Sequence, residues 1–253
     1  MENKHVEYRC GSEASGTVIV FVHGIMGSPL QFDYLIQRLS GAYSIENLLL
    51  PGHGGTMRDF QKSSMTLWQS YVDERIRRLQ KTYRNIVLVG HSMGCLLSIQ
   101  AALSSPQQIR GLFLTAMPLK IHISVPYVRN SLMAAFSKNS SNALIAAARK
   151  LKSVSVSTPL EYPLAIPRCI ELLNKCKITR GLIKELRLPV VVVQSENDEI
   201  VSGKSLRYVK EQQNIQAVIV RNAGHYYYPP DAQTQISHAL EQFVVEVIAE
   251  DAS

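Results

Sequence analysis

One serine stands in a sequence context that favours nucleophilic catalysis. Ser92 is the centre of Gly90-His-Ser-Met-Gly94, which follows the apolar residues 86–89 and precedes the apolar run 96–103. This order predicts a strand, a sharp turn and a helix, with the serine at the helix N-terminus. Free N–H groups at such an end stabilise negative charge. Ser92 is therefore the candidate nucleophile.

An acidic loop and a histidine follow the last two apolar runs of the chain. Residues 189–194 lead into a loop that contains Asp198, and residues 216–220 lead into His225. A serine hydroxyl needs a general base that is itself oriented by an acid. Since strand ends meet at one edge of a parallel sheet, we expect Asp198 as the acid and His225 as the base beside the serine. The rival acids in the same loop are Glu196 and Glu199.

Short apolar runs alternate with helical patterns and must position these side chains. Strands are expected over residues 17–22, 43–50, 86–89, 110–115, 189–194 and 216–220. Helical patterns are expected over residues 29–39, 65–83, 96–103 and 240–248. Continuously apolar strands that alternate with helices are typical of an α/β fold, in which a mostly parallel sheet has helices on both faces.

The alternation breaks between residues 119 and 187, where the pattern is helical. An insertion of this length is too long for a plain loop. We therefore expect a small helical cap over residues 119–187, inserted between two late strands of a core formed by residues 1–118 and 188–253. Its apolar residues either roof an acyl site, pack on the core, or do both. They are Val125, Val128, Leu132, Met133, Phe136, Leu144, Ile145, Ala148 and Leu151.

Composition and charge narrow the class of protein. A chain of 253 residues that is 46% hydrophobic and 19% charged can bury a large core, which predicts a folded protein. No apolar run approaches the roughly 20 residues that span a bilayer, and the first residues lack a secretory signal. We expect a cytoplasmic protein without stable membrane insertion. The net charge of +7 comes without a recognisable nucleic-acid module, so no nucleic-acid partner is expected.

The remaining polar patterns favour ordinary structural roles. The four cysteines and seven histidines lack metal-ligand spacing, so no metal is expected. Cys169 and Cys176 are seven residues apart and are expected to be buried thiols on one helix face. A solvent-exposed helix face is expected for the basic cluster Arg75, Arg77, Arg78, Lys81 and Arg84.

Together these motifs resemble the α/β-hydrolase superfamily, and in particular bacterial carboxylesterases and monoacylglycerol lipases. The resemblance rests on His23-Gly24 with Gly27, Pro51-Gly-His-Gly54, the Ser92 motif, the loop with Asp198, and Gly224-His225, and covers nearly the whole chain except the cap. It implies that Ser92 is the nucleophile, Asp198 the acid and His225 the base, without a cofactor. Cys95 departs from it, because many relatives have another glycine there.

The resemblance also implies an oxyanion hole formed by the backbone N–H groups of Ile25 and Met93. Losing one such donor typically costs about 3 kcal/mol of transition-state stabilisation. We expect His23 to tie its loop together by hydrogen bonding rather than act as the base. His53, in the Pro51-Gly-His-Gly54 segment, is expected to be structural.

The function that these residues favour is hydrolysis of an ester with an apolar acyl group. We expect a serine carboxylesterase for short- to medium-chain acyl esters or monoacylglycerols, acting through an acyl-enzyme on Ser92. The alternatives are a carbon–carbon bond hydrolase, an acyltransferase and a non-catalytic ligand-binding homologue, which fold analogy alone does not separate. The sequence leaves open whether the protein is a monomer or a dimer.

Overall fold

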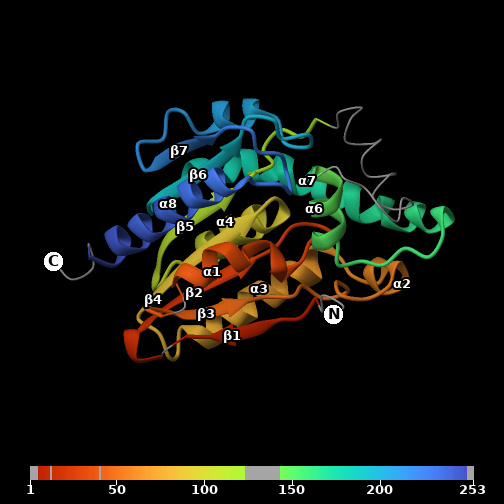
Figure 1. Ribbon diagram of the computed structural model, residues 1–253. Coiled ribbons are helices and arrows are strands. Elements are labelled where there is room, and N and C mark those ends of the chain that lie inside the picture. The colour runs from red at the N-terminus through yellow and green to blue at the C-terminus, as the bar shows by residue number, and fades with distance from the viewer. Residues whose placement is uncertain (1–4, 12, 40, 123–142, 250–253) are drawn as a thin grey trace.

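The computed structural model describes residues 5–11, 13–39, 41–122 and 143–249, and its strands in these ranges form one seven-stranded sheet (Figure 1). The strands are β1 (Tyr8–Cys10), β2 (Thr17–Val22), β3 (Ser44–Asn47), β4 (Asn85–His91), β5 (Ile109–Thr115), β6 (Val190–Ser195) and β7 (Ile215–Val220). Their order is β1-β3-β2-β4-β5-β6-β7. Only β1 pairs antiparallel with its neighbour. The mostly parallel sheet is confirmed.

Side chains alternate between two hydrophobic clusters, one on each face of the sheet. In β2, Val18, Val20 and Val22 join one cluster, and Ile19 and Phe21 join the other. The first cluster is covered by α3 (Met65–Leu79), α4 (Met93–Ser104) and α7 (Ile166–Leu182). The second is covered by α1 (Asp33–Leu39) and α8 (Pro230–Ala249). Helices therefore lie on both faces, as expected.

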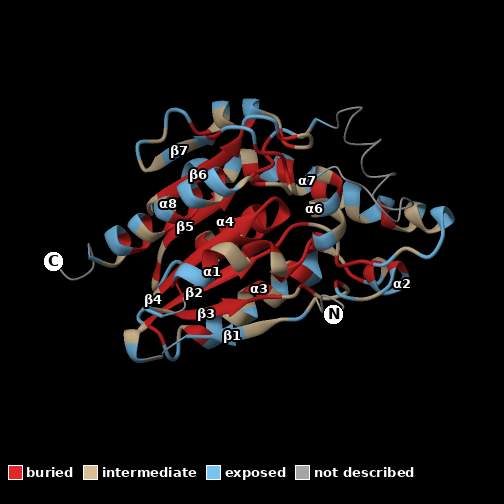
Figure 2. Cartoon of the chain, in the orientation of Figure 1, coloured by how far each residue is buried: buried red, intermediate tan, exposed pale blue. Residues whose placement is uncertain are grey.

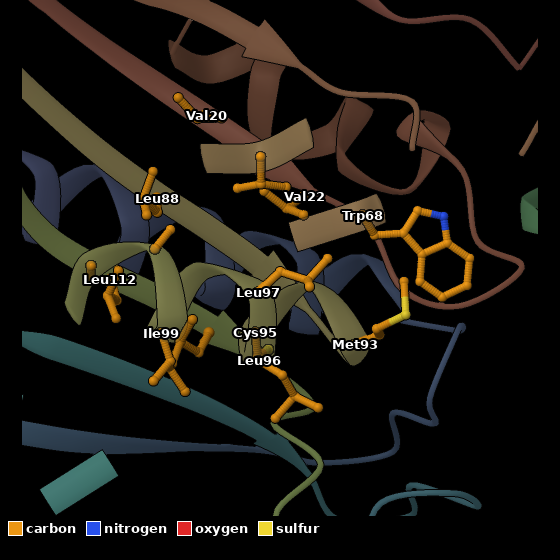
Figure 3. Close-up of a cluster of buried hydrophobic side chains, with 14 of the residues drawn as sticks. Val20, Val22, Trp68, Leu88, Met93, Cys95, Leu96, Leu97, Ile99 and Leu112 are labelled. Carbon is orange, nitrogen blue, oxygen red and sulfur yellow. The ribbon is translucent and has the colours of Figure 1, made fainter. Parts of the chain in front are cut away.

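Helix α4 is buried on nearly every side, because only Gln100, Leu103 and Ser104 of its residues are not fully buried. Figure 2 shows the central strands and α4 as the most buried part of the chain. On the side of α4 that faces α3, Leu97 and Met93 lie near Trp68 (Figure 3). The Trp68 indole is fully buried, and its Nε1–H donates to the carbonyl of Pro51 at 2.8 Å. This packing fixes the helix that begins at the candidate nucleophile.

The shorter elements refine the boundaries that the sequence predicts. The 3₁₀ turn η2 (Pro29–Phe32) precedes α1, and α2 (Met57–Gln61) begins at a capping box formed by Thr56 and Asp59. The other 3₁₀ turns outside residues 119–187 are η1 (Glu13–Ser15) and η5 (Gly203–Tyr208). Strand β1 and helix α2 were missed because segments of three and five residues are too short to establish a period.

The described part of the 119–187 region is mainly helical. It contains α6 (Ala143–Leu151), η3 (Pro159–Ala165), α7 and η4 (Ile183–Glu185). Five of the apolar residues expected on the cap helices lie outside the described residues, namely Val125, Val128, Leu132, Met133 and Phe136. Of the other four, Ile145 and Leu151 are buried, and Leu144 and Ala148 are half-buried. One face of α7 packs into the same cluster as α4.

Two expectations about surface patterns are wrong. Cys176 is buried but Cys169 is exposed, because the buried residues of α7 all lie beyond its first turn. Arg75 is not a solvent-face residue, since its side chain is only 12% exposed and binds Glu7 and Glu46. Helical periodicity does not reveal these partners, which come from distant parts of the sequence. No helix in the described ranges is long and apolar enough to cross a membrane.

Candidate active site

The turn between β4 and α4 holds Ser92 in a strained backbone conformation. Its φ of 52° lies in the left-handed region that non-glycine residues rarely adopt. A Cβ at Gly94 would lie 1.9 Å from the carbonyl oxygen of Val22, and one at Gly90 would lie 2.8 Å from the Cα of Cys95. Glycine is therefore required on both sides of Ser92, and the spacing seen in the sequence has a steric cause.

Cys95 lies buried beneath this turn. Its Sγ is within hydrogen-bonding distance of the carbonyl oxygens of Gly90 at 3.3 Å and Thr115 at 3.2 Å. Burial raises the pKa of the thiol well above its ordinary value, so the group stays protonated. The departure from glycine at this position adds packing and a thiol donor under the turn rather than a second nucleophile.

The carboxylate of Asp198 and the ring of His225 form a buried pair at the ends of β6 and β7. His225 Nδ1 lies 2.9 Å from Asp198 Oδ2 and 3.1 Å from Oδ1. Asp198 Oδ1 also accepts the N–H groups of Ile200 at 2.9 Å and Val201 at 2.7 Å. Burial alone would raise the pKa of Asp198, but His225 and these N–H groups lower it below the ordinary value. An ionised Asp198 can therefore orient the imidazole.

The ring of His225 lies beside the nucleophile turn. Its centroid is 4.8 Å from that of His91, the residue immediately before Ser92. Tyr226 packs edge-on against the same ring at 4.7 Å. In the described part of the chain, Ser92 Oγ has no hydrogen-bond partner. The geometry thus brings the nucleophile turn and the Asp198–His225 pair together, with the serine hydroxyl uncommitted.

The three carboxylates of the acidic loop have different contacts. Only Asp198 contacts the His225 ring, whereas Glu199 accepts the backbone N–H of His225 at 2.7 Å. The remaining acid, Glu196, is exposed. Glu199 thus holds the loop that carries the histidine, a role that spacing in the sequence does not indicate. Asp198 is the acid that the geometry favours.

The two expected oxyanion donors belong to α4 and to the loop after β2, and both segments lie close to the candidate nucleophile. Met93 is the first residue of α4, where backbone N–H groups lack intrahelical acceptors. A Cβ at Gly24 would lie 3.0 Å from the Cβ of Ser92, so the loop with Ile25 approaches the nucleophile closely. Among the described residues, neither the Ile25 nor the Met93 N–H has a hydrogen-bond partner. Both groups are available to a developing negative charge.

His23 and His53 connect the loop that carries Ile25 to the segment after β3. His23 Nε2 accepts the N–H of Leu50 at 3.0 Å, and His53 Nε2 accepts the N–H of Met26 at 3.0 Å. Burial lowers the pKa of His23 to about 4 and that of His53 well below its ordinary value. Both rings are therefore neutral acceptors, which agrees with the structural roles expected for them.

His91 is a buried imidazole that the sequence motif does not assign. Its Nδ1 lies 3.0 Å from Thr115 Oγ1. Burial, and then the charges of His225 and His23, lower its pKa well below the ordinary value. The neutral ring therefore contacts β5, and the turn also bonds to this strand directly, because the N–H of Ser92 donates to the carbonyl of Thr115 at 3.0 Å. Within the residues that the structure describes, no group of three or more His, Cys, Asp or Glu side chains could hold a metal ion.

The chain matches known proteins over most of its length. Residues 19–239 match the model of the alpha/beta hydrolase family. One structure of the metagenome-derived lipolytic enzymes LipS and LipT is 17% identical, with 94% of this chain and 97% of that chain covered and a TM-score of 0.71. The Paleococcus ferrophilus monoacylglycerol lipase is 18% identical, with 96% and 98% covered and a TM-score of 0.69. These likenesses confirm the predicted fold.

A curated relative matches over a shorter stretch. The chloroplastic protein PHYLLO of Arabidopsis thaliana is 28% identical over 107 residues, which is 40% of this chain. The match spans only 6% of the length of that protein. It therefore indicates a related segment inside a much longer chain.

Proposed function

Because the chain belongs to the alpha/beta hydrolase family, we propose that it is a serine hydrolase that cleaves carboxylic esters through an acyl-enzyme on Ser92. Family membership and the lipolytic structures similar to it support a hydrolase. The observation that carries the serine mechanism is the buried Asp198–His225 pair, held beside a strained turn with a free serine hydroxyl. No cofactor takes part in this proposal.

In the proposed acylation step, His225 acts as the general base. Its Nε2 takes the proton of the Ser92 hydroxyl while Oγ forms a bond to the carbonyl carbon of the ester. The carbonyl oxygen becomes an oxyanion that accepts the N–H groups of Ile25 and Met93. The bond to the alcohol oxygen then breaks, and the alcohol leaves with the proton from His225. Asp198 stabilises the imidazolium that exists between these proton transfers.

Deacylation repeats the same transfers with water. His225 takes a proton from water as the water oxygen attacks the acyl carbon. The bond between that carbon and Ser92 Oγ breaks, and Oγ regains a proton from His225. The products are a carboxylic acid and the free enzyme, so the serine and histidine end in their starting states. In an acyltransferase, an alcohol would replace water in this step.

We propose short- to medium-chain acyl esters or monoacylglycerols as the substrate class, with residues 119–187 as the cap over the acyl group. Ile25 and Met26 are half-buried apolar residues of the loop whose Gly24 approaches Ser92. Ser153 binds the same loop, and the apolar residues Leu151 and Val154, before and after it in the sequence, are both buried. Apolar side chains around the loop favour an apolar acyl group, since each buried CH₂ contributes about 0.8 kcal/mol.

A series of p-nitrophenyl esters from acetate to decanoate tests this proposal. We expect kcat/KM to rise from acetate into the medium-chain range and to fall where the acyl site ends. A folded protein that turns over none of these esters would contradict ester hydrolysis and favour a non-catalytic homologue or a carbon–carbon bond hydrolase. Turnover of acetate alone, without dependence on chain length, would contradict the apolar acyl site but keep the serine mechanism.

A further inference from the structure

The loop that carries Ile25 is a tight turn held in a strained conformation. Its first and last residues are joined by the hydrogen bond from the N–H of Gly27 to the carbonyl of Gly24 at 3.0 Å. Met26 has a φ of 54°, in the left-handed region that favours glycine. A non-glycine residue there costs about 1 kcal/mol or more, and it persists only where its surroundings hold it.

Met26 is held by hydrogen bonds at both of its backbone polar groups. Its N–H donates to His53 Nε2 at 3.0 Å, and its carbonyl accepts the N–H of Ser153 at 3.0 Å. The Ser153 hydroxyl also donates to the carbonyl of the next residue, Gly27. The turn is thus held by the core on one side and by Ser153 on the other.

Ser153 is far in the sequence from His23 and His53, the other residues that hold this loop. It lies two residues after the end of α6, within the 119–187 region and more than a hundred residues from the turn. Its side chain is buried, with the residue 4% exposed. A buried hydroxyl with a carbonyl acceptor fixes the relative position of the two segments, because breaking the bond would leave that carbonyl without this donor.

We propose that Ser153 is a positioning residue that keeps the N–H of Ile25 directed at the developing oxyanion. The inference rests on the function proposed above. By holding the carbonyls of Met26 and Gly27, Ser153 keeps the turn in its strained form beside Ser92. The segment after α6 and the oxyanion hole then move together, so a displacement of that segment withdraws a catalytic donor.

Ser155 provides a matched control two residues further on. Its hydroxyl donates to the carbonyl of Gly55 at 3.1 Å, and its N–H donates to the same oxygen at 2.9 Å. Ser155 thus makes the same kinds of bond, from the same segment, to a loop that carries no proposed catalytic group. Comparing Ser153→Ala with Ser155→Ala therefore distinguishes the effect of losing the hydroxyl that holds the oxyanion turn from the effect of losing a serine hydroxyl elsewhere in this segment.

The test compares wild type, Ser153→Ala and Ser155→Ala in full-length protein, at a temperature well below each Tm. For Ser153→Ala we expect kcat to fall about tenfold or more with KM within about twofold, because an oxyanion donor acts in the transition state. The rate of inactivation by diethyl p-nitrophenyl phosphate should fall by a similar factor, since its phosphoryl oxygen enters the same hole. Ser155→Ala should stay within about twofold of wild type on both readouts.

Two outcomes would overturn the proposal. One is a Ser153→Ala protein whose kcat and inactivation rate match those of Ser155→Ala, even if its Tm is lower. The other is a rise in KM with unchanged kcat. If Ser153→Ala does not fold, Ser153→Cys keeps the size of the side chain with a weaker donor, and the same readouts apply. Wild type that neither hydrolyses esters nor reacts with the phosphate would contradict the proposed function instead.

Discussion

The carboxyl end of the sheet and its outer edge differ in their buried polar groups, which are neutral histidines at the first and ion pairs at the second. Among the described residues, five non-glycine residues have a positive φ, and four of them follow the ends of strands at the carboxyl end. These four are Met26, Ser92, Ala116 and Asn222. The histidine rings of His23, His53 and His91 at this end are buried, and burial lowers the pKa of each.

The outer edge network consists of Glu7, Arg9, Glu46, Tyr71 and Arg75, which join β1, β3 and α3. Arg75 binds Glu46 at 2.6 Å and Glu7 at 2.7 Å, while Arg9 binds the other oxygen of Glu46 at 2.7 Å. Tyr71 donates to Glu7. Here each acidic side chain has a basic partner. A cavity of about 440 Å³ opens beside this network, and Ser92 is not among its lining residues.

Strained backbone conformations are therefore found at the carboxyl end of the sheet, and paired charges are found at its outer edge. Strained backbone and free N–H groups gather at the end that holds the proposed active site, and they persist because the surrounding structure holds them. Paired buried charges mainly fix one arrangement of the elements, since removing one partner leaves the other buried without compensation. Variants at the carboxyl end should therefore cost activity, and variants in the outer edge network should cost stability.

The largest effect is expected for Ser92→Ala, which removes the nucleophile. We expect kcat for p-nitrophenyl esters to fall by at least about 10⁵-fold, with a Tm close to that of wild type. Ser98→Ala is the matched control, because Ser98 lies buried on the same helix, where its hydroxyl has no partner in the described chain. Comparable losses in the two variants would mean that the serine does not act as the nucleophile.

Asp198→Asn should have the next largest effect. The substitution removes the charge that stabilises the imidazolium and favours the wrong tautomer of His225, so kcat should fall by about 10⁴-fold. Glu199→Gln keeps an acceptor for the N–H of His225 and should cost about tenfold or less. Steady-state kinetics of both variants would identify the acid, and a larger loss in Glu199→Gln or in Glu196→Gln would show that Asp198 is the wrong choice.

Arg75→Met should show the opposite behaviour. The change leaves Glu46, whose side chain is 3% exposed, with Arg9 alone, and should lower the free energy of unfolding by about 3 kcal/mol. Chemical denaturation measures this loss, and kcat per folded molecule should stay near wild type. Arg77→Met is the control, because Arg77 is an exposed residue of the same helix. A loss of kcat without a loss of stability in Arg75→Met would break the division between the two regions.

The smallest effect concerns stability at mildly acid pH. Burial lowers the pKa of His23 to about 4, whereas an imidazole in the unfolded chain titrates near 6.5. Between these values the unfolded state binds more protons, so stability should fall as the pH falls through this window. Denaturation midpoints from about pH 7 to about pH 5 should show this slope. Burial also lowers the pKa of His53, so His53→Gln should make the slope smaller. An unchanged slope would contradict a neutral His53 in the folded protein.

The sequence predicts most of the strands because their apolar runs are continuous. It predicts the positions of Ser92, Asp198 and His225 because each follows such a run, and parallel strands end at one edge. Glycine spacing around Ser92 is also readable, since steric collision requires it. The α/β class and the mostly parallel sheet therefore follow from local pattern alone.

Contacts between distant segments could not be predicted in this way. Ser153 looks like an ordinary polar residue after a helix, and only the fold brings it to the carbonyl of Gly27. The burial of Arg75 depends on Glu7 and Glu46, which helical periodicity does not place beside it. Cys169 is exposed although its spacing from Cys176 suits one helix face. The first turn of α7, which carries Cys169, holds none of the buried residues of this helix.

The most direct test of the account is to identify the residue that a fluorophosphonate modifies. The reagent forms a stable bond to an activated serine Oγ with loss of fluoride, so the intact mass reports the number of adducts and peptide mapping reports their place. We predict one adduct per chain, on Ser92, with ester turnover lost in proportion to labelling. An adduct on another residue, or full ester turnover by protein labelled at Ser92, would contradict the account.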